Sequence, residues 1–197
     1  MTFADRVRGL GQTVVFDSKC PDEAALEGVL EAVRLAPSTA NLQPWEIVVL
    51  RGQDGKERLV EATLDPFFRD DPSLRPAWLK NAPVVLVFCA DVKRVKARFG
   101  GERALAIASR DVAAAVLVFR LAALEAGLRT GVVIEFDPAG VRKALGIPAG
   151  VEPLWIVAAG YGRGGAEGGG ETGAEVDADV DYRPCLPLGE ILHMERW

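Results

Sequence analysis

The chain has 197 residues, of which 49% are hydrophobic and 26% are charged, and it includes 21 glycines and a single histidine. This length suits one globular domain with a full-sized core, and the apolar fraction excludes a disordered chain. Lys and Arg number 23 against 28 Asp and Glu, a net charge of -5. Because no run of Lys or Arg concentrates a positive field, we do not expect nucleic acid as a partner.

The first part of the chain alternates helix and strand patterns. Its N-terminus, Met1 to Leu10, carries charges and lacks the apolar stretch of a signal peptide. Apolar residues then recur every three or four positions from Pro21 to Ala36, which predicts a helix that Pro37 ends. A polar turn leads into a predicted strand at Trp45 to Leu50, and Lys56 to Thr63 is predicted to be a short helix.

The middle of the chain contains the most apolar segments. We expect residues 65–81 to form an irregular loop with a helical turn at 77–81. The continuous apolar run from Pro83 to Cys89 predicts a strand buried on both faces. A long alanine-rich helix is predicted from about Arg103 to Ala126, capped by Gly127.

Charged residues interrupt this long helix: Arg110, Asp111, Arg120 and Glu125. A lipid-spanning helix would not tolerate so many charges near its centre. We therefore expect a helix buried in protein, and no membrane partner.

The last part of the chain changes composition. We predict a strand at Gly131 to Phe136, a short helix at Asp137 to Leu145 and a strand at Pro153 to Ala159. Residues 160–181 are glycine-rich and predicted to be a flexible loop, and residues 182–197 form an apolar C-terminal arm. This order of elements favours an α+β fold over regular βαβ winding.

Cysteine and histidine content restricts the possible chemistry. Cys20, Cys89 and Cys185 are far apart and odd in number, which predicts no disulfide framework and a cytoplasmic protein. His193, near the C-terminus, is the single histidine, so metal sites built on several His and Cys ligands are excluded and no metal is expected. We therefore expect a cofactor, rather than a side-chain triad, to carry any chemistry.

Two motifs are interpreted as accidental matches. Gly160 to Gly165 fits G-x-G-x-x-G, but more glycines follow where a helix would have to begin. Asp177, Asp179 and Asp181 resemble the opening of a calcium loop, but Tyr182 stands where the loop needs glycine.

The turn from Ala36 to Trp45 is the most informative segment. It offers hydroxyls at Ser38 and Thr39 and amides at Asn41 and Gln43, on a backbone stiffened by two prolines. Such a turn can approach a flat polar ring and match its edge with hydrogen-bond donors and acceptors. Most turns of this kind only connect a helix to a strand, and this turn can be such a connection. The residues alone leave both interpretations open.

This turn resembles the signature of the nitroreductase family of FMN-dependent oxidoreductases. The likeness extends over nearly the whole chain, in the motifs Asp22-Glu-x-x-Leu-x-x-Val-Leu30, Asn41-x-Gln-Pro-Trp45, Ala82-Pro-Val-Val-Leu-Val-Phe88 and Leu121-Ala-Ala-Leu-Glu-Ala-Gly-Leu128. The resemblance implies that residues 1–197 form one FMN-binding α+β domain. It implies a mixed central sheet flanked by helices and an intertwined homodimer, in which the C-terminal arm pairs with the partner subunit.

The resemblance also implies which residues contact FMN, at a dimer interface with contributions from both chains. One side of the flavin ring would be lined by Pro37, Ser38, Thr39 and Asn41. Ile134 and Glu135 would present backbone near the reactive nitrogen N5, and Arg8 and Arg183 would hold the phosphate end. No catalytic side chain is implied.

The chain departs from the family before its first long helix. One subgroup of the family carries Arg-x-Leu-Arg-x-x-Arg-x-Phe, whereas the matching stretch here keeps Arg8 but has Gly11 and Val14 at the other two arginine positions. A charge-assisted hydrogen bond contributes about 1.5–3 kcal/mol, so two lost arginines would weaken FMN binding by orders of magnitude. Either another cation such as Arg6 or Arg183 compensates, or the site has changed its role.

Two functions follow from these observations. The first is an oxidoreductase in which NAD(P)H reduces FMN and is replaced by a small-molecule electron acceptor, such as a nitroaromatic or quinone, in a ping-pong sequence. The alternative is a non-catalytic or specialised flavin- or ligand-binding dimer on the same scaffold, because the two phosphate-binding arginines are absent.

Overall fold

The computed structural model describes residues 2–64, 75–162 and 191, so most of the predicted loop and C-terminal arm lies outside the described residues. The helices are α1 (Phe3–Arg8), α2 (Glu23–Val33), η1 (Thr39–Asn41), α3 (Gln53–Ala62), η4 (Ala77–Asn81), α4 (Val92–Phe99), α5 (Ala104–Glu125) and α6 (Pro138–Leu145). The strands are β1 (Trp45–Leu50), β2 (Val84–Asp91), β3 (Arg129–Val133) and β4 (Val151–Gly160). The α+β class expected from the sequence is confirmed.

The four strands form one sheet in the order β1-β2-β4-β3. Every pair of neighbours is antiparallel, whereas we expected mixed strand directions. The register explains the difference. Leu50, at the end of β1, pairs with Val85 at the start of β2, because α3 and η4 return the chain to the end of the sheet that it had just left.

The apolar run that predicted a doubly buried strand is β2, in the middle of the sheet. Its side chains alternate between two cores, since Leu86 and Phe88 belong to one cluster and Val85 and Val87 to the other. All of these residues have no exposed surface. A strand that supplies both faces of a sheet has to be apolar at every position, which is why no alternation was visible in the sequence.

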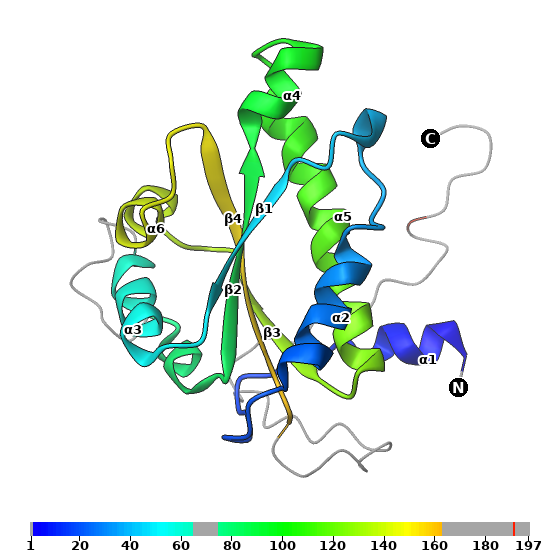
Figure 1. Ribbon diagram of the computed structural model, residues 1–197, viewed down its shortest axis with the longest axis vertical. Coiled ribbons are helices and arrows are strands. Elements are labelled where there is room, and N and C mark those ends of the chain that lie inside the picture. The colour runs from blue at the N-terminus through cyan, green and yellow to red at the C-terminus, as the bar shows by residue number, and fades with distance from the viewer. Residues whose placement is uncertain (1, 65–74, 163–190, 192–197) are drawn as a thin grey trace.

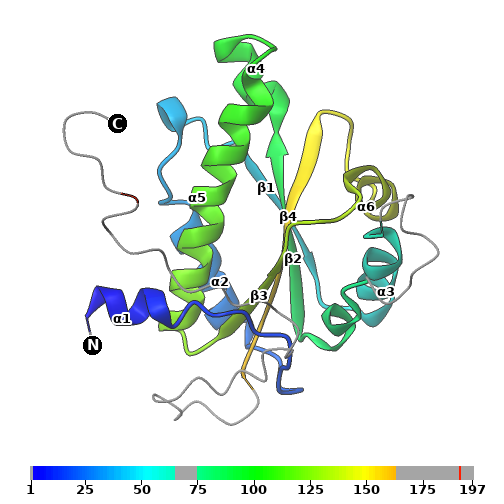
Figure 2. The same ribbon diagram turned by 180° about the vertical axis from the view of Figure 1, so that it is seen from behind.

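Two layers of helices cover the sheet. Helices α2 and α5 lie against one face, and α3 and α6 against the other (Figures 1 and 2). Among the described helices, none combines the length and apolar content that a membrane span requires.

The sequence predictions missed two short helices, α1 and α4. Helix α4 is amphipathic over only eight residues, and Val95 is its one buried residue. Its N-terminus is capped by the Asp91 carboxylate, which accepts hydrogen bonds from the backbone N–H groups of Lys93 and Arg94. The helix ends at Gly100, whose φ of 81° favours glycine.

Buried alanines let α5 lie close to the sheet, and one aromatic pair fills the remaining space. The ring of Phe119 on α5 meets the ring of Phe88 on β2 edge to face, with centroids 5.4 Å apart. We expect Phe119→Ala to lower the free energy of unfolding by about 3–5 kcal/mol, because it leaves a cavity in a fully buried contact. Urea unfolding measures this, with Phe3→Ala as the control.

Phe3 is 71% exposed, so its loss is expected to cost about 0.5 kcal/mol at most. Equal destabilisation by the two variants would contradict the packing described for α5.

Candidate functional site

The turn between α2 and β1 has an unusual backbone. Ala40, Asn41 and Gln43 have φ angles of 49°, 55° and 46°, all in the left-handed region. A residue with a Cβ loses roughly 1–2 kcal/mol in this region. Three such residues within four positions persist only where surrounding contacts enforce them, and such strain is concentrated at ligand sites.

Asp111 on α5 supplies the main anchor of the turn. Its Oδ2 accepts a hydrogen bond of 3.0 Å from the backbone N–H of Thr39, and its Oδ1 accepts one of 2.9 Å from the Thr39 hydroxyl. The carboxylate belongs to a residue that is only 7% exposed. Because a buried carboxylate needs hydrogen-bond donors, Asp111 and Thr39 constrain each other.

The rest of the turn is also held by side chains. The Ser38 Oγ accepts from the backbone N–H of Gln43 at 3.0 Å, and the Gln43 amide donates to the carbonyl of Arg34 at 3.1 Å. Arg94 on α4 donates to the Gln43 carbonyl at 2.5 Å. Contacts from α2, α4 and α5 thus preorganise the turn.

These bonds decide what the turn still offers to a ligand. The Thr39 hydroxyl gives its hydrogen to Asp111, so its oxygen can only accept from a ligand. The Ser38 hydroxyl hydrogen and the exposed amide of Asn41 form no other hydrogen bond in the described chain, so both remain free for a ligand. Donors and acceptors placed side by side in this way suit the edge of a flat heteroaromatic ring such as flavin.

The N-terminal segment lies along the outer edge of β3. The Gln12 amide donates to the carbonyl of Val132 at 2.8 Å and accepts from its N–H at 2.9 Å, and the N–H of Thr13 donates to the carbonyl of Thr130. A Cβ on Gly131 would lie 2.1 Å from the Thr13 carbonyl oxygen, so this approach requires glycine. The positions that lack the expected arginines are therefore held against the sheet.

Arg120 on α5 secures the same segment. Its guanidinium donates to the carbonyls of Leu10 and Gly11 and, at 3.1 Å, to the Thr130 hydroxyl. Burial lowers its pKa from the ordinary value for arginine. Arg120 thus lies beside Gly11, but its hydrogen bonds are made to the protein.

Arg6 does not stand free as a substitute anion-binding group. Its guanidinium forms a 2.5 Å ion pair with Glu125 at the end of α5. This pair is on the surface, where an ion pair contributes roughly 1 kcal/mol at most. Any anion at this place would have to compete with that carboxylate.

The predicted cofactor residues form two groups, and no hydrogen bond joins the groups within the described chain. Pro37, Ser38, Thr39 and Asn41 are in the turn that Asp111 anchors. Arg8 ends α1, and the exposed Ile134 and Glu135 follow β3, beside the segment that Arg120 anchors. Asp111 and Arg120 are nine residues apart on α5, which separates the anchors by roughly 14 Å along the helix. Arg183 lies outside the described residues.

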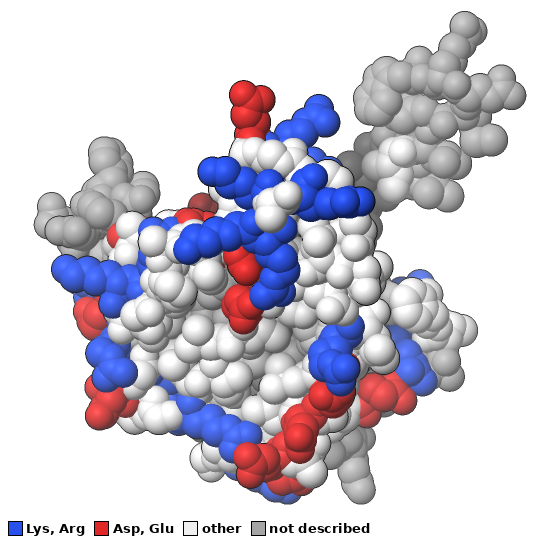
Figure 3. All heavy atoms as spheres, turned by 45° about the horizontal axis from the view of Figure 1, so that its top comes forward, with Lys and Arg blue, Asp and Glu red and all other residues white. Residues whose placement is uncertain are grey.

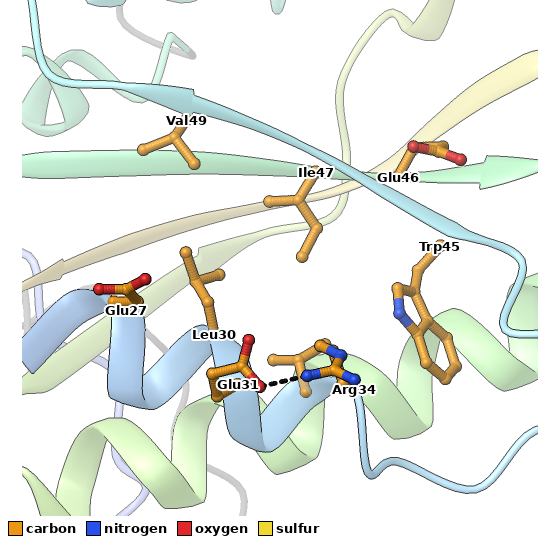
Figure 4. A pocket seen from close by; sticks show the side chains of 9 residues that line it. Glu27, Leu30, Glu31, Arg34, Trp45, Glu46, Ile47 and Val49 are labelled. Carbon is orange, nitrogen blue, oxygen red and sulfur yellow. Dashed lines mark hydrogen bonds and ion pairs between the residues drawn. The ribbon is translucent and has the colours of Figure 1, made fainter. Parts of the chain in front are cut away.

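A groove of about 320 Å³ runs between α2 and β1, next to the turn (Figure 4). Its apolar side chains include Leu30, Ile47 and Trp45, and the ion pair of Glu31 with Arg34 lies at its side. A second hollow, of about 550 Å³, lies beside Phe16 at the other end of β1. Neither hollow is lined by a predicted cofactor residue.

The described residues hold no group of three or more His, Cys, Asp and Glu side chains that could bind a metal. Cys89, interpreted from the sequence as inert, is fully buried, and this burial raises the pKa of its thiol to about 12. The thiol therefore stays protonated at neutral pH and is a poor nucleophile.

Sequence reasoning missed Asp111 and Arg120 as anchors, although a signal was present. Both are charged residues that interrupt an otherwise apolar helix. A charged side chain on a helix that packs in a core needs a polar partner. Asp111 and Arg120 therefore each indicate a segment with free polar groups that packs against α5. The identity of that segment was not visible from one sequence.

Proteins of one family resemble this chain over most of its length. A sequence model of the nitroreductase family matches residues 15–161. The chain is 34% identical over 166 residues to a protein of Thermus thermophilus named NADH dehydrogenase, covering 71% of this chain and 76% of that protein. It is 32% identical over 158 residues to a Streptomyces coelicolor protein with the provisional name NADH dehydrogenase/NAD(P)H nitroreductase, covering 73% and 74%.

The fold is also found among solved structures. One, described as an FMN-dependent nitroreductase from Clostridium difficile, superposes with a TM-score of 0.72 at 20% identity, covering 99% of this chain and 100% of that one. These features define an α+β sandwich with a preorganised polar turn at the edge of its sheet. With well over half of its length matched by the family model, the chain belongs to the nitroreductase family.

Proposed function

We propose that this protein is an FMN-dependent oxidoreductase that uses NAD(P)H to reduce nitroaromatic, quinone or related conjugated acceptors. Membership of the nitroreductase family supports the class of reaction. The names of two relatives, which include NADH dehydrogenase and NAD(P)H nitroreductase, support the reductant, and the description of a solved structure of the same fold supports FMN. We place the activity in the cytoplasm, because the sequence has no disulfide framework.

The observation that carries the proposal is the strained turn at 37–43 and its anchor on Asp111. Three left-handed residues and a buried carboxylate cost conformational and desolvation free energy that a simple connection between a helix and a strand does not require. The anchored backbone of the turn fixes where the Ser38 hydroxyl and the Asn41 amide lie. This preorganisation favours a ligand-binding turn over a simple connection.

Each group of residues has a distinct task in this proposal. FMN, when bound, supplies the hydride chemistry between NAD(P)H and the acceptor, which leaves orientation and electrostatics to the protein. Ser38, Thr39 and Asn41 hold one side of the ring. The backbone of Ile134 and Glu135 meets its reactive edge, and Arg8 and Arg183 hold the phosphate.

Anaerobic stopped-flow mixing tests the reaction. The FMN-loaded protein is mixed with NADH or NADPH, and absorbance near ~450 nm, where oxidised flavin absorbs, is followed. We expect rapid bleaching with at least one of the two reductants, and recovery when a quinone is added. Flavin that stays oxidised with both reductants overturns the proposal.

A second candidate function is a non-catalytic flavin- or ligand-binding dimer on this scaffold. The lack of charge at Gly11 and Val14 favours it, together with Arg120, whose guanidinium is occupied by backbone carbonyls at this place. Calorimetric titration of the apoprotein with FMN tests the observation that favours this second candidate. A submicromolar dissociation constant removes the reason for this second candidate.

We also propose that the protein acts as a homodimer with two equivalent FMN sites. The two groups of predicted FMN residues are anchored at different points of α5, and no hydrogen bond joins them within the described ranges, which suits a site completed by a second copy. Helix α5 exposes Leu105 (45%) and Leu117 (49%), and Figure 2 shows the helix along the outside of its layer. A second copy that packs on α5 would remove these side chains from water, which stabilises the dimer.

Leu117→Glu is expected to convert the dimer to a monomer, because a charge would be buried at the interface, while Leu117→Ala should remain dimeric. Light scattering measures the mass. The wild type should have the mass of two 21.1 kDa chains. A monomeric wild type contradicts the dimer, and a dimeric Leu117→Glu variant contradicts the role of α5.

A further inference from the structure

Helix α4 concentrates positive charge, although its Lys and Arg residues do not form one continuous run. Residues 92–98 include Lys93, Arg94, Lys96 and Arg98 and no acidic residue. Valine and alanine interrupt these cations in the sequence. On the helix, Lys93 lies beside Lys96 and Arg94 lies beside Arg98, because residues three or four apart share a face. Figure 3 shows basic side chains gathered at the end of the molecule that α4 forms. Basic residues that form no run in the sequence are thus gathered at one end of the fold.

Most of this charge is not neutralised by the protein. Arg94 pairs with Glu46 at 2.6 Å and with Asp91 at 3.3 Å. Lys93, Lys96 and Arg98, which we call the α4 cationic surface, are exposed and form no ion pair within the described ranges. This surface is therefore free to attract an anion from solution.

Helix electrostatics alone do not explain the arrangement. Lys96 and Arg98 lie in the last turn of α4, where cations favour the helix dipole. Lys93 lies in the first turn, where a cation is unfavourable. Its side chain covers Gly150 instead, since a Cβ there would lie 2.4 Å from the Lys93 Cε.

The α4 cationic surface lies beside the proposed flavin-binding turn. Arg94 connects the two by its bond to the Gln43 carbonyl, and the N–H of Asp91 donates to the carbonyl of Pro44 at 2.6 Å. Both Figure 1 and Figure 2 show α4 and the turn at the same end of α5. An anion held by α4 would therefore be close to a ligand on the turn.

We propose that the α4 cationic surface binds the phosphate groups of the pyridine dinucleotide that reduces the flavin, an inference that rests on the proposed function. The reductant is an anion and the chain carries a net charge of -5, so the protein as a whole repels it. A local basic surface next to the flavin offsets that repulsion and raises the rate of productive encounter. An uncharged acceptor such as a quinone gains nothing from it.

The test compares two double variants with the same change in net charge. Lys96→Glu/Arg98→Glu reverses the α4 cationic surface. Arg58→Glu/Lys143→Glu is the control, because it changes two exposed cations on α3 and α6, against the opposite face of the sheet. Calorimetry measures the affinity of each for ADP-ribose, which carries the diphosphate of the dinucleotide but cannot transfer a hydride.

We expect the α4 variant to bind ADP-ribose about tenfold more weakly than the wild type, and the control to change little. Wild-type binding should also weaken as salt is raised, and this dependence should be lost in the α4 variant. Equal affinities for the two variants, or a wild type that does not bind ADP-ribose, overturn the proposal. Tight binding of a short DNA duplex without ADP-ribose binding also overturns it, in favour of nucleic acid.

This readout separates the inference from the proposed function. In one outcome, ADP-ribose binding depends on α4 but neither NADH nor NADPH reduces the flavin. This outcome contradicts the proposed oxidoreductase activity and supports the nucleotide site on α4. In the other outcome, the wild type and both double variants reduce flavin rapidly with the same KM for NAD(P)H. This outcome supports the oxidoreductase activity and contradicts the role of α4.

Discussion

Asp111→Ala is expected to weaken FMN binding by about 100-fold, or about 2.7 kcal/mol. The substitution removes both hydrogen bonds that Thr39 donates, each of which contributes about 1.5–3 kcal/mol because the acceptor is charged. Without them the left-handed residues Ala40 and Asn41 can relax, and the turn loses its fixed shape. Calorimetric titration of the apoprotein with FMN measures the change.

Two further variants show whether the loss of FMN affinity comes from the loss of the anchor of the turn. Asp111→Asn keeps the shape of the side chain and one oxygen acceptor, so it should restore most of the affinity. Asp137→Ala removes another carboxylate that caps a backbone N–H, at the start of α6, and should lower stability by about 1 kcal/mol without changing FMN affinity. If Asp111→Ala binds FMN like the wild type, the turn is only a connection.

Gly11→Arg is expected to strengthen FMN binding by about tenfold, through one charge-assisted contact to the phosphate. The structure accommodates the change, because a Cβ on Gly11 would meet nothing within 4 Å and the position has no positive φ. The residue is exposed, so the new guanidinium keeps its hydration until phosphate binds. Titrations of the apoprotein with FMN and with riboflavin measure the effect.

The gain should be specific to the phosphate and to the position. Riboflavin has no phosphate, so its affinity should not change. Gly28→Arg on α2 adds the same charge at another exposed glycine with open space, and should leave both affinities unchanged. A Gly11→Arg variant that binds riboflavin more tightly as well, or FMN no better, means that the phosphate lies elsewhere.

The sequence predicted the core elements of this fold because their signals are local. Every predicted helix and strand that lies within the described residues is present, and the strand at Trp45–Leu50 has the predicted bounds. Asp137 and Pro138 begin α6 as expected, and Gly127 follows the end of α5 with a φ of 75°. Capping residues and apolar periodicity act within a few positions, so one sequence is sufficient to find them.

The directions of the strands and the anchors of the turn depend on distant contacts. Strands β1 and β2 are antiparallel because α3 and η4 return the chain to the same end of the sheet, which no local pattern encodes. Asp111 and Thr39 are 72 residues apart and meet only after α5 has packed beside α2. The turn itself was recognised by resemblance, but its strain came from the structure, since Ala40 and Gln43 carry no preference for left-handed backbone.

The absorbance spectrum of the freshly purified protein tests the central claim most directly, because FMN binding underlies every proposal made for this site. We expect flavin bands near ~450 nm, with FMN as the compound released on denaturation. A protein that is colourless as purified, and again colourless when it is loaded with FMN and then dialysed, contradicts the account.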